Sequence, residues 1–452
     1  MRKKTISGFS KLSKKGKIRW VANNFFTEPE RVTRELMSFW HEDKNLQRIL
    51  DGFSENTISN YPLPFGIAPN FVVNGKTYAV PMVIEESSVV AAAANAAKFW
   101  MNRGGFHAEV IDTQKLGQIH FYWKGDKRNL QNAFQQLTEQ LRIDAKYITS
   151  NMEKRGGGVL DIQLVDMTHL EPAYYQLRVA FDTCDSMGAN FINSVLEEFA
   201  ASLERFVEKR FEGEEKRVDV IMAILSNYTP ECLVRAWVEC PVEELKSANQ
   251  NMEARVFADR FCRAVRIAHI DPYRATTHNK GIFNGIDAVV LATGNDFRAI
   301  EACGHTYATR DGQYRSLTHC TIENDVFRFQ LELPIALGTV GGLTNLHPIA
   351  RLSLELLGNP EAQDLMMIIA ATGLAQNFAA IRSLVTTGIQ HGHMKMHLLN
   401  ILNHLEASEK EMNEAFEYFK DKIVSFTTVR DFLDWLRGKK KNPVKAIALK
   451  NK

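Results

Sequence analysis

The feature that most constrains this chain is a change of hydrophobic periodicity between about residues 106 and 226, within a sequence that is otherwise largely helical. In this interval apolar and polar residues alternate, a pattern typical of β-strands, over five segments: HAEVIDT, GQIHFYW, VLDIQLVDM, YYQLRVAFD and RVDVIMAIL. Two helices are expected among these strands, one at 127–142 and a longer one after Asp185. The second helix repeats apolar residues at helical spacing from Phe191 onward, so one of its faces covers a sheet.

Two helices on one mostly antiparallel sheet predict a compact α+β unit with ferredoxin-like topology. The flanking sequence predicts helices over residues 20–50, an alanine-rich helix that starts after Ser88, and a helical appendage at the C-terminus. An Asn74-Gly75 pair between two β-rich runs predicts a tight hairpin. After residue 227 the chain is expected to be largely helical, broken by a buried strand, AVVLATG, and by the glycine-rich run GTVGGLTNLHP. The fold class is therefore α+β, with a sheet unit inserted into a mainly helical body.

The composition excludes several classes of protein. The 55 Lys and Arg residues nearly balance the 53 Asp and Glu residues, which leaves no global field to hold nucleic acid or an acidic membrane surface. Basic runs at both ends are interpreted as solvated tails. Because neither a signal peptide nor a run of ~18 apolar residues is found, a cytoplasmic protein is expected, without a membrane partner. The six cysteines lack Cys-x-x-Cys spacing, which predicts reduced, mostly buried thiols rather than disulfides or a zinc site.

Three polar residues are candidates for chemistry. Lys280 lies in a segment that we interpret as a polar, glycine-punctuated turn, and Asp296 follows where the expected buried strand opens into a helix. Glu86 directly precedes the N-cap of the alanine-rich helix, where the helix dipole favours a carboxylate. Each also has a purely structural interpretation, since a surface lysine, an N-cap aspartate and an acidic helix start are common.

Two further motifs are weaker signals. His393 and His397 have the i, i+4 spacing of metal ligands, but there is no H-E-x-x-H motif and no third ligand, so an acid role for His393 is favoured over a metal. The DSMGAN segment runs from a strand through a small-residue turn into a long helix. Free amides at the start of that helix suit a pyrophosphate, although a single glycine is more typical of an ordinary tight turn.

Taken together, the motifs resemble a known enzyme family. EESSVVAAAA, DSMGAN, THNKGIFNGIDAVVLATGNDFRAIEACGHTYA, GTVGGLTNLHP and GIQHGHMKMH occur in the order found in 3-hydroxy-3-methylglutaryl-coenzyme A (HMG-CoA) reductases, and the chain resembles their bacterial class II branch. The likeness runs from near residue 55 to past residue 400. It implies a large substrate-binding domain, an inserted nucleotide-binding domain and a C-terminal flap, with these expected bounds: 1–110 and 223–387 for the large domain, 111–222 for the small domain, and 388–452 for the flap.

The resemblance assigns roles position by position. The positions that match the family's catalytic residues are Glu86, Lys280, Asp296 and, on the flap, His393. The positions that match substrate contacts or links between catalytic groups are Ser88, Arg274 and Asn284. The turn that matches the family's nucleotide-binding turn consists of Asp185, Ser186, Met187, Gly188, Ala189 and Asn190. One departure stands out: the family's Glu-Asn-x-x-Gly signature here reads ENTIS, with Ser59 in place of glycine.

The expected chemistry explains these residue types. Reduction of a thioester to an alcohol takes two hydrides, through a hemithioacetal and an aldehyde, so negative charge develops on the carbonyl oxygen twice. Lys280 is expected to stabilise that oxygen from a dry pocket, with Asp296 orienting the ammonium and coupling it to Glu86. Which of Lys280 and Glu86 donates the proton stays open, because coupled groups resist such assignment. His393 is expected to protonate the departing coenzyme A thiolate.

The sequence favours NADPH over NADH as the cofactor. Family members that favour NADH place an acidic residue just before the triple glycine of the small domain, where YITSNMEKRGGG has Thr149, with Lys154 and Arg155 beside it. A missing carboxylate and nearby cations favour a ribose 2′-phosphate. NADH remains the alternative, since loop cations are commonly just solvated.

The function implied is reduction of HMG-CoA to mevalonate and coenzyme A with two NADPH, for isoprenoid synthesis. The alternatives are a degradative, NAD-linked enzyme that oxidises mevalonate, and an inactive acyl-coenzyme A-binding homologue. The resemblance also implies a homodimer, or a higher assembly of dimers, with active sites between subunits.

Overall fold

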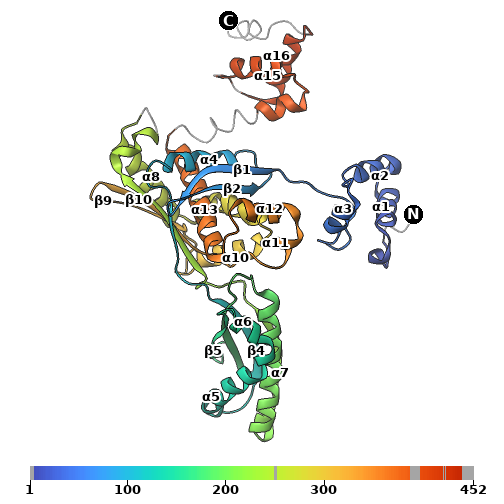
Figure 1. The fold of residues 1–452 in the computed structure, drawn as a ribbon, viewed down its shortest axis with the longest axis vertical. Coiled ribbons are helices and arrows are strands. Elements are labelled where there is room, and N and C mark those ends of the chain that lie inside the picture. The colour runs from blue at the N-terminus through green and yellow to red at the C-terminus, as the bar shows by residue number, and fades with distance from the viewer. Residues whose placement is uncertain (1–4, 249–251, 387–397, 421, 423, 440–452) are drawn as a thin grey trace.

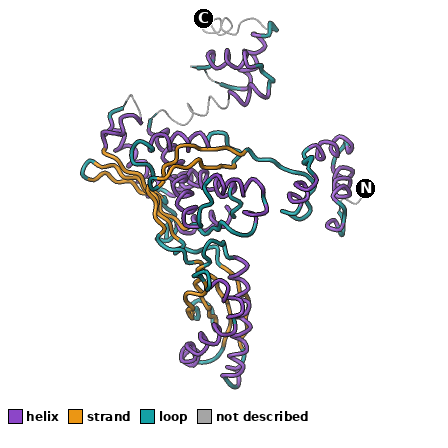
Figure 2. Tube along the Cα trace, in the orientation of Figure 1, coloured by secondary structure: helices purple, strands orange, loops and turns teal. Residues whose placement is uncertain are grey.

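The computed structural model describes residues 5–248, 252–386, 398–420, 422 and 424–439. Figure 1 shows a central body of sheet and helices, a smaller unit below it, and separate groups of helices at the two ends of the chain. Within these described residues, three separate hydrophobic cores lie in the body, in the smaller unit and in the C-terminal helices. The α+β fold class is therefore confirmed by the mixture of helices and small antiparallel sheets (Figure 2).

The smaller unit has the expected ferredoxin-like topology. Its elements follow in the order β4 (Lys115–Trp123), α5 (Lys127–Asp144), α6 (Lys146–Glu153), β5 (Gly158–Asp166), β6 (Tyr174–Asp182), α7 (Ala189–Arg210) and β7 (Val218–Leu225). The sheet order is β5-β6-β4-β7, with every pair antiparallel. Helices α5 and α7 bury their apolar stripes against this sheet, with Leu137 and Phe199 fully buried.

One of the five expected strands lies elsewhere. The segment at 107–113 contributes β3 (His107–Val110), which pairs with β8 (Leu233–Pro241) in the sheet of the central body. Alternation alone had grouped this strand with the small unit, which was wrong, because alternation identifies a strand but not the sheet that it joins. The bounds implied by the resemblance, in contrast, put residues 107–110 in the large domain. The chain therefore leaves the central body and enters the small unit only after β3.

The central body contains strands that the sequence analysis missed. β8, β9 (Thr318–Glu323) and β10 (Val326–Pro334) extend a four-stranded antiparallel sheet in the order β3-β8-β10-β9. The expectation of a largely helical region after residue 227 was therefore incomplete. The sequence did contain a strand signal here, because side chains alternate between inward and outward positions along both β8 and β10.

The helices of the central body surround this sheet and the hairpin described below. Their bounds are α8 (Ala254–Ile270), α9 (Pro272–Ala292), α10 (Phe297–Tyr307), α11 (Leu343–Leu346), α12 (Pro348–Leu356) and α13 (Ala362–Val385). The run AVVLATG, expected as a buried strand, instead forms the end of α9, with Val289 and Val290 fully buried. A short apolar run cannot be distinguished from a buried helical turn by periodicity alone.

The predicted hairpin is present. β1 (Phe65–Val73) pairs with β2 (Lys76–Val83), and the linking residues Asn74 and Gly75 have φ values of 49° and 79°. Two positive φ angles suit the tight turn whose twist matches that of the strands, which is why Asn-Gly is favoured there. The alanine-rich helix α4 (Val89–Trp100) packs on β1 and α13.

Helix α13 lies in the core of the body. Among the described helices, α13 is long and apolar enough to cross a membrane by length and composition. However, 83% of its most apolar 18-residue window is buried inside the protein. Core packing accounts for that apolarity, because a helix that is hydrophobic all round is buried on every face.

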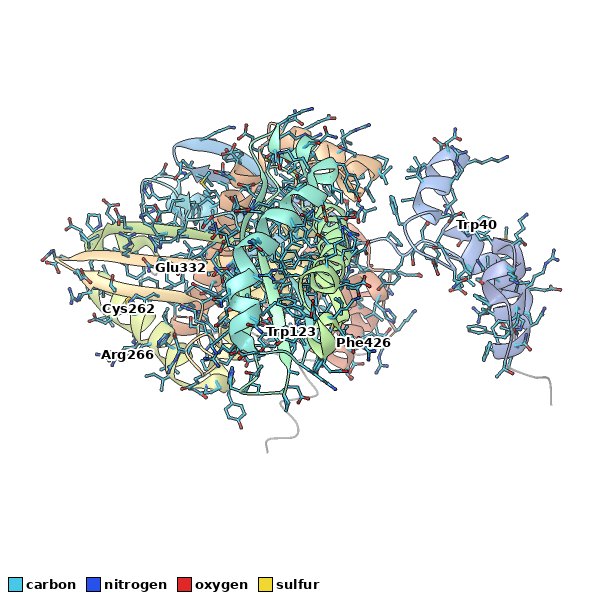
Figure 3. All side chains as sticks on the ribbon, turned by 90° about the horizontal axis from the view of Figure 1, so that it is seen from below. Trp40, Trp123, Cys262, Arg266, Glu332 and Phe426 are labelled. Carbon is cyan, nitrogen blue, oxygen red and sulfur yellow. A yellow bond between two sulfur atoms is a disulfide. The ribbon has the colours of Figure 1, made fainter. Side chains whose placement is uncertain are left out.

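Helices at the two ends form separate groups. The N-terminal group consists of η1 (Phe9–Lys11), α1 (Lys14–Phe25), α2 (Pro29–Ser38) and α3 (Lys44–Asp51), and it stands apart from the body in two perpendicular views (Figures 1 and 3). At the other end, α15 (Glu409–Tyr418) and α16 (Phe426–Leu436) share a small core. Short 3-10 turns complete the fold at η2 (Gly213–Lys216) and η3 (Val242–Ala248).

The cysteines differ in part from expectation. Cys262 of α8 and Cys320 of β9 form a disulfide, so the prediction that all six thiols are reduced was wrong. Cysteines 58 positions apart in the sequence give no spacing motif, and only the packing of α8 on β9 brings them together. The four free cysteines are buried or half-buried, as expected.

Candidate active site

One cluster of predicted site residues forms on the exposed face of α9. Lys280 Nζ donates to Glu86 Oε2 over 3.1 Å, and Asn284 Nδ2 reaches the same oxygen at 3.5 Å. Lys280 lies in the middle of α9 and not in a turn, as we had expected, so that residue 284 follows one helical turn later on the same face. The helix therefore presents an ammonium and an amide to one carboxylate.

The loop between β2 and α4 supplies the other half of this cluster. Ser88 is the N-cap of α4, but its hydroxyl donates to Glu86 Oε1 over 3.2 Å and makes no cap hydrogen bond. Glu86 therefore receives hydrogen bonds on both carboxylate oxygens, and the start of α4 adds a favourable dipole. The structure thus brings together Glu86, Ser88, Lys280 and Asn284, which are far apart in the sequence.

This cluster is open to solvent in the single chain. The side chains of Lys280 and Glu86 are 64% and 36% exposed. The expectation of a buried ammonium in a dry pocket is not met within one chain. An exposed ion pair is worth little, because water screens it. Arg274, earlier on α9, is half-buried, and burial lowers the pKa of its guanidinium.

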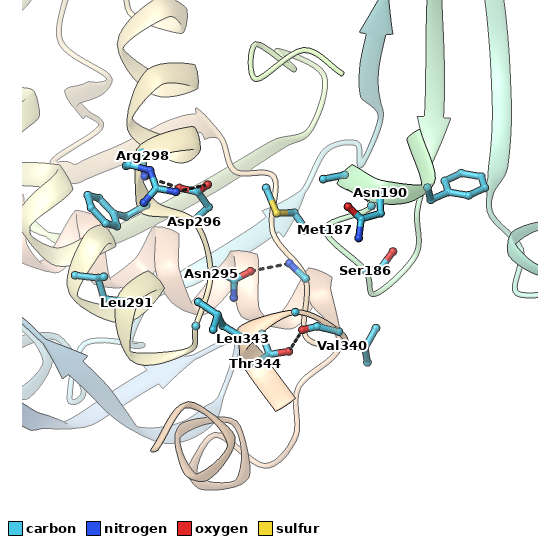
Figure 4. Close-up of a pocket in the computed structure, with 18 residues that line it drawn as sticks. Ser186, Met187, Asn190, Leu291, Asn295, Asp296, Arg298, Val340, Leu343 and Thr344 are labelled. Carbon is cyan, nitrogen blue, oxygen red and sulfur yellow. Dashed lines mark hydrogen bonds and ion pairs between the residues drawn. The ribbon is translucent and has the colours of Figure 1, made fainter. Parts of the chain in front are cut away.

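Asp296 lies in a different place from the Lys280–Glu86 pair. It is the N-cap of α10, accepting from the amides of Arg298 and Ala299, and it pairs with the Arg298 guanidinium at 2.9 Å (Figure 4). The N-cap interpretation was correct. Among the described residues its carboxylate contacts Arg298 and not Lys280, so one chain does not unite the three expected catalytic groups.

Asp296 instead lines a cavity of about 600 Å³ together with the DSMGAN turn. Residues from Ser186 to Asn190 form one wall, and the segments 294–298 and 338–344 form the other (Figure 4). Gly188 has a φ of 87°, and an added Cβ would lie 2.3 Å from the Thr183 side chain. The turn therefore requires glycine for both its conformation and its packing.

The start of α7 suits an anion. Gly188 is the N-cap and offers no side chain, so the first amides of this 22-residue helix receive no side-chain cap. Such amides, together with the helix dipole, favour a phosphate or pyrophosphate. The DSMGAN turn thus has the geometry that its sequence predicts.

Asp185 anchors the turn and does not line the cavity. Its carboxylate accepts from the amide of Ala362 at the start of α13 over 2.8 Å, and its carbonyl accepts from Thr339 over 2.8 Å. Gly338, opposite the turn, has no room for a side chain, since a Cβ would lie 2.3 Å from the Met187 amide nitrogen. Gly338 opens the glycine-rich run GTVGGLTNLHP, for which the sequence predicted no separate role.

The residues proposed for cofactor choice lie at the end of α6. Thr149 is buried, and its hydroxyl donates to Glu153 over 2.7 Å. Glu153 also pairs with Lys146, whose hydrogen bond lowers the pKa of that carboxyl. Lys154 and Arg155 are exposed, and the Arg155 carbonyl accepts from Cys184, next to the DSMGAN turn. The cations therefore lie near the turn, while the neighbouring carboxylate is already engaged.

Two other predictions concern the ends of the matching region. His393, with His391 and His397, lies outside the described residues. Ser59, which replaces the family's glycine, donates its hydroxyl to the Leu36 carbonyl of α2 over 2.7 Å. This hydrogen bond ties the ENTIS loop to the N-terminal helices, a contact that glycine could not make.

Comparison with known proteins covers nearly the whole chain. Residues 18–398 match the family model described as hydroxymethylglutaryl-coenzyme A reductase. The chain is 34% identical to 3-hydroxy-3-methylglutaryl-coenzyme A reductase of Archaeoglobus fulgidus, over 96% of this chain and 95% of that protein. It is 31% identical to a probable reductase of the same name from Borreliella burgdorferi, over 94% and 93% of the two chains.

Among solved structures, the class II 3-hydroxy-3-methylglutaryl-CoA reductase of Streptococcus pneumoniae is similar, in a form bound to NADPH in open conformations. It is 38% identical, with a TM-score of 0.69 over 86% of this chain and 92% of that one. A second structure of that reductase is 36% identical, with a TM-score of 0.68 over 95% of this chain and 100% of that one.

Proposed function

The chain belongs to the hydroxymethylglutaryl-coenzyme A reductase family, and we propose that it reduces HMG-CoA to mevalonate and coenzyme A with two NADPH. The observation that carries the proposal is the hydrogen-bonded pair of Lys280 and Glu86 at 3.1 Å, built from two distant segments. An ammonium fixed by a carboxylate beside an amide is the arrangement that a thioester reduction needs, since negative charge develops on oxygen at each hydride step.

We assign the roles of this chain's residues as follows. Reduced nicotinamide, when bound, supplies the two hydrides. Lys280 holds its ammonium against the carbonyl oxygen and stabilises the charge that forms there. Glu86 accepts a hydrogen bond from that ammonium, and the proton that the carbonyl oxygen receives comes from this Lys280–Glu86 pair. Ser88 and Asn284 each donate a hydrogen bond to one oxygen of Glu86, which holds the Glu86 carboxylate in place beside Lys280.

His393 completes the proposed chemistry. When the hemithioacetal collapses to the aldehyde, coenzyme A leaves as a thiolate, and a nearby imidazolium can protonate it. Protonation prevents the thiolate from attacking the aldehyde again before the second hydride arrives. The flap position that the resemblance implies for His393 would allow spent cofactor to leave between the two steps.

We propose a homodimer in which a second copy completes the site. The exposed Lys280–Glu86 pair would gain its dry surroundings only when another surface covers it. Asp296, engaged with Arg298 in its own chain, would then join the lysine of the neighbouring subunit. The N-terminal helices stand apart from the body, and their side chains Phe26 and Phe39 are about half exposed, which suits an arm that packs on a partner.

The cavity between the DSMGAN turn and residues 338–344 fits the nucleotide. Its volume of about 600 Å³ and the uncapped start of α7 suit a dinucleotide pyrophosphate. Arg155 and Lys154 near the turn, with Glu153 already engaged, favour the 2′-phosphate of NADPH over NADH. The NADPH in the similar pneumococcal reductase supports this choice.

A paired-cofactor assay tests the proposal. The absorbance of reduced nicotinamide is followed with HMG-CoA and either NADPH or NADH, and in reverse with mevalonate, coenzyme A and either oxidised cofactor. We expect faster oxidation of NADPH. A clear preference for NAD with mevalonate would instead identify a degradative enzyme. Absence of turnover with every combination would leave only an acyl-coenzyme A-binding protein.

A further inference from the structure

A buried lysine lies behind the nucleotide-binding turn. Lys115, at the start of β4, is only 5% exposed, on the strand face that carries the fully buried Ile119. Its ammonium donates to Thr183 Oγ1 at 2.5 Å, to the Ser186 carbonyl at 2.8 Å and to the Leu337 carbonyl at 3.5 Å. All three donors of the ammonium are therefore used.

These contacts join the two walls of the cavity. Ser186 belongs to the DSMGAN turn, whereas Leu337 immediately precedes the segment 338–344 of the central body. Thr183 also donates to the Ser186 carbonyl over 2.7 Å, which closes a small network around the turn. On the far side, the Gly338 amide donates to Asn295, the residue before Asp296.

The charge itself is costly at this position. Burial lowers the pKa of Lys115, while the nearby Asp182 and Asp185 favour its charged form. Buried ionic groups contribute little to stability compared with apolar side chains of similar shape, so stability gives a weak reason for a lysine here. A positional requirement gives a stronger one, because only a long donor can bind carbonyls from both walls at once.

We infer that Lys115 is a positioning residue for the nucleotide, which holds the DSMGAN turn against residues 337–340 so that the start of α7 faces Asp296. The inference rests on the proposed function, since it assumes that the turn binds the dinucleotide. Its consequence is selective: losing Lys115 displaces the nucleotide wall and leaves the Lys280–Glu86 cluster intact.

The test compares Lys115→Met with the wild-type protein. Methionine fills similar volume but donates no hydrogen bond. We expect the KM for NADPH and its Kd, measured by nucleotide fluorescence without substrate, to rise about tenfold, equivalent to one hydrogen bond. The KM for HMG-CoA and the kcat at saturating NADPH should stay within about twofold. Lys115→Arg, which keeps donors, should recover part of the NADPH affinity.

Matched variants separate positioning from a general loss of packing. Ile119→Val removes a methylene from the same strand away from the turn, so its NADPH affinity should equal that of the wild type. If Lys115→Met does not fold, Thr183→Val carries the test, since it removes the hydroxyl that bridges Lys115 and Ser186. A folded variant with wild-type NADPH affinity would overturn the inference, whereas an inactive wild-type enzyme would refute the proposed function instead.

Discussion

Two lysines at the two halves of the proposed site differ in almost every physical respect. Lys280 is 64% exposed and contacts one carboxylate, Glu86, on the open face of α9. Lys115 is 5% exposed and binds three oxygens between the two walls of the nucleotide cavity. The first is held loosely where a substrate can reach it, and the second is fixed where none can.

Under the proposed roles, this difference in burial separates a reactive group from a positioning group. A reactive ammonium must be free to contact a new oxygen, so its own chain leaves it partly solvated and a partner or ligand removes the water. A positioning ammonium works only when every donor is already satisfied, because an unsatisfied buried group is costly. Burial alone therefore does not distinguish the proposed catalytic lysine from the proposed positioning one.

The largest effect is expected from Lys280→Ala, which tests the reactive side of the comparison. Turnover should fall by about a thousandfold or more, roughly 4 kcal/mol of transition-state stabilisation. The variant should still fold, because within one chain the Lys280–Glu86 pair is exposed and contributes little to stability. Lys98→Ala, at an exposed position on α4, is the control and should retain wild-type rates. A Lys280→Ala enzyme with wild-type activity would disprove the assignment.

A smaller effect is expected from Gly338→Ala, which tests the fixed side. The new Cβ would lie 2.3 Å from the Met187 amide nitrogen, so the turn or the opposite wall must move. We expect the KM for NADPH to rise about thirtyfold, roughly 2 kcal/mol, while the KM for HMG-CoA stays unchanged. Gly281→Ala adds the same methyl where the nearest atom is 3.9 Å away, and its KM for NADPH should not change. Equal effects of both substitutions would argue against a tight contact at the turn.

The buried face of α9 gives a pH prediction. His278 is 1% exposed, and burial, aided by Arg274, lowers its pKa to about 3. An unfolded chain binds that proton below about pH 6.5, so the stabilisation is complete above this pH and is lost as the pH falls towards 3. The free energy of unfolding should decrease by up to about 1.4 kcal/mol per pH unit from this residue alone.

Denaturant unfolding measured between pH 7.5 and about 5 gives this slope. This pH window lies above the range where most carboxylates titrate. Other histidines, including His305, also have pKa values lowered by burial and add to the wild-type slope, whereas burial raises the pKa of Asp287 to about 8 and gives a slope of the opposite sign. His278→Gln removes one titrating group and should therefore show a shallower dependence. An unchanged slope in this variant would mean that the folded and unfolded states bind the His278 proton equally, so that burial does not lower its pKa.

The smallest effect is expected at the edge of the nucleotide wall. Arg155→Ala should raise the KM for NADPH about fivefold, roughly 1 kcal/mol, and leave the KM for NADH unchanged, because only NADPH carries the 2′-phosphate. Arg128→Ala, an exposed arginine at the start of α5, is the matched control. Equal changes for both cofactors would remove Arg155 from cofactor choice.

Local sequence patterns predicted the fold well wherever the pattern depends on a single turn or a single helix end. The Asn74-Gly75 hairpin and the N-cap role of Asp296 follow from short-range chemistry. Strand β3 was identified but assigned to the wrong sheet, and AVVLATG was taken for a strand. Both errors concern long-range packing, which alternation and apolar runs do not encode.

The candidate site was identified from motif order, but its arrangement was not. Lys280 was placed in a turn although it lies within α9, and its distance from Asp296 could not be foreseen. Lys115 was missed, although a lysine at an inward position of KLGQIHFYW is an irregularity that alternation exposes. Charged residues on an apolar face merit attention because burial without partners is costly.

The sequence by itself determined the order of the elements, the family motifs and the residue types able to bind a thioester and a dinucleotide, because these depend on local spacing. Only the tertiary structure decided which of those residues meet: Glu86 with Lys280, Asp296 with Arg298, and Lys115 with both cavity walls. Contacts between distant segments depend on how complete helices and sheets pack, and that packing minimises the free energy of the whole chain rather than of any one segment.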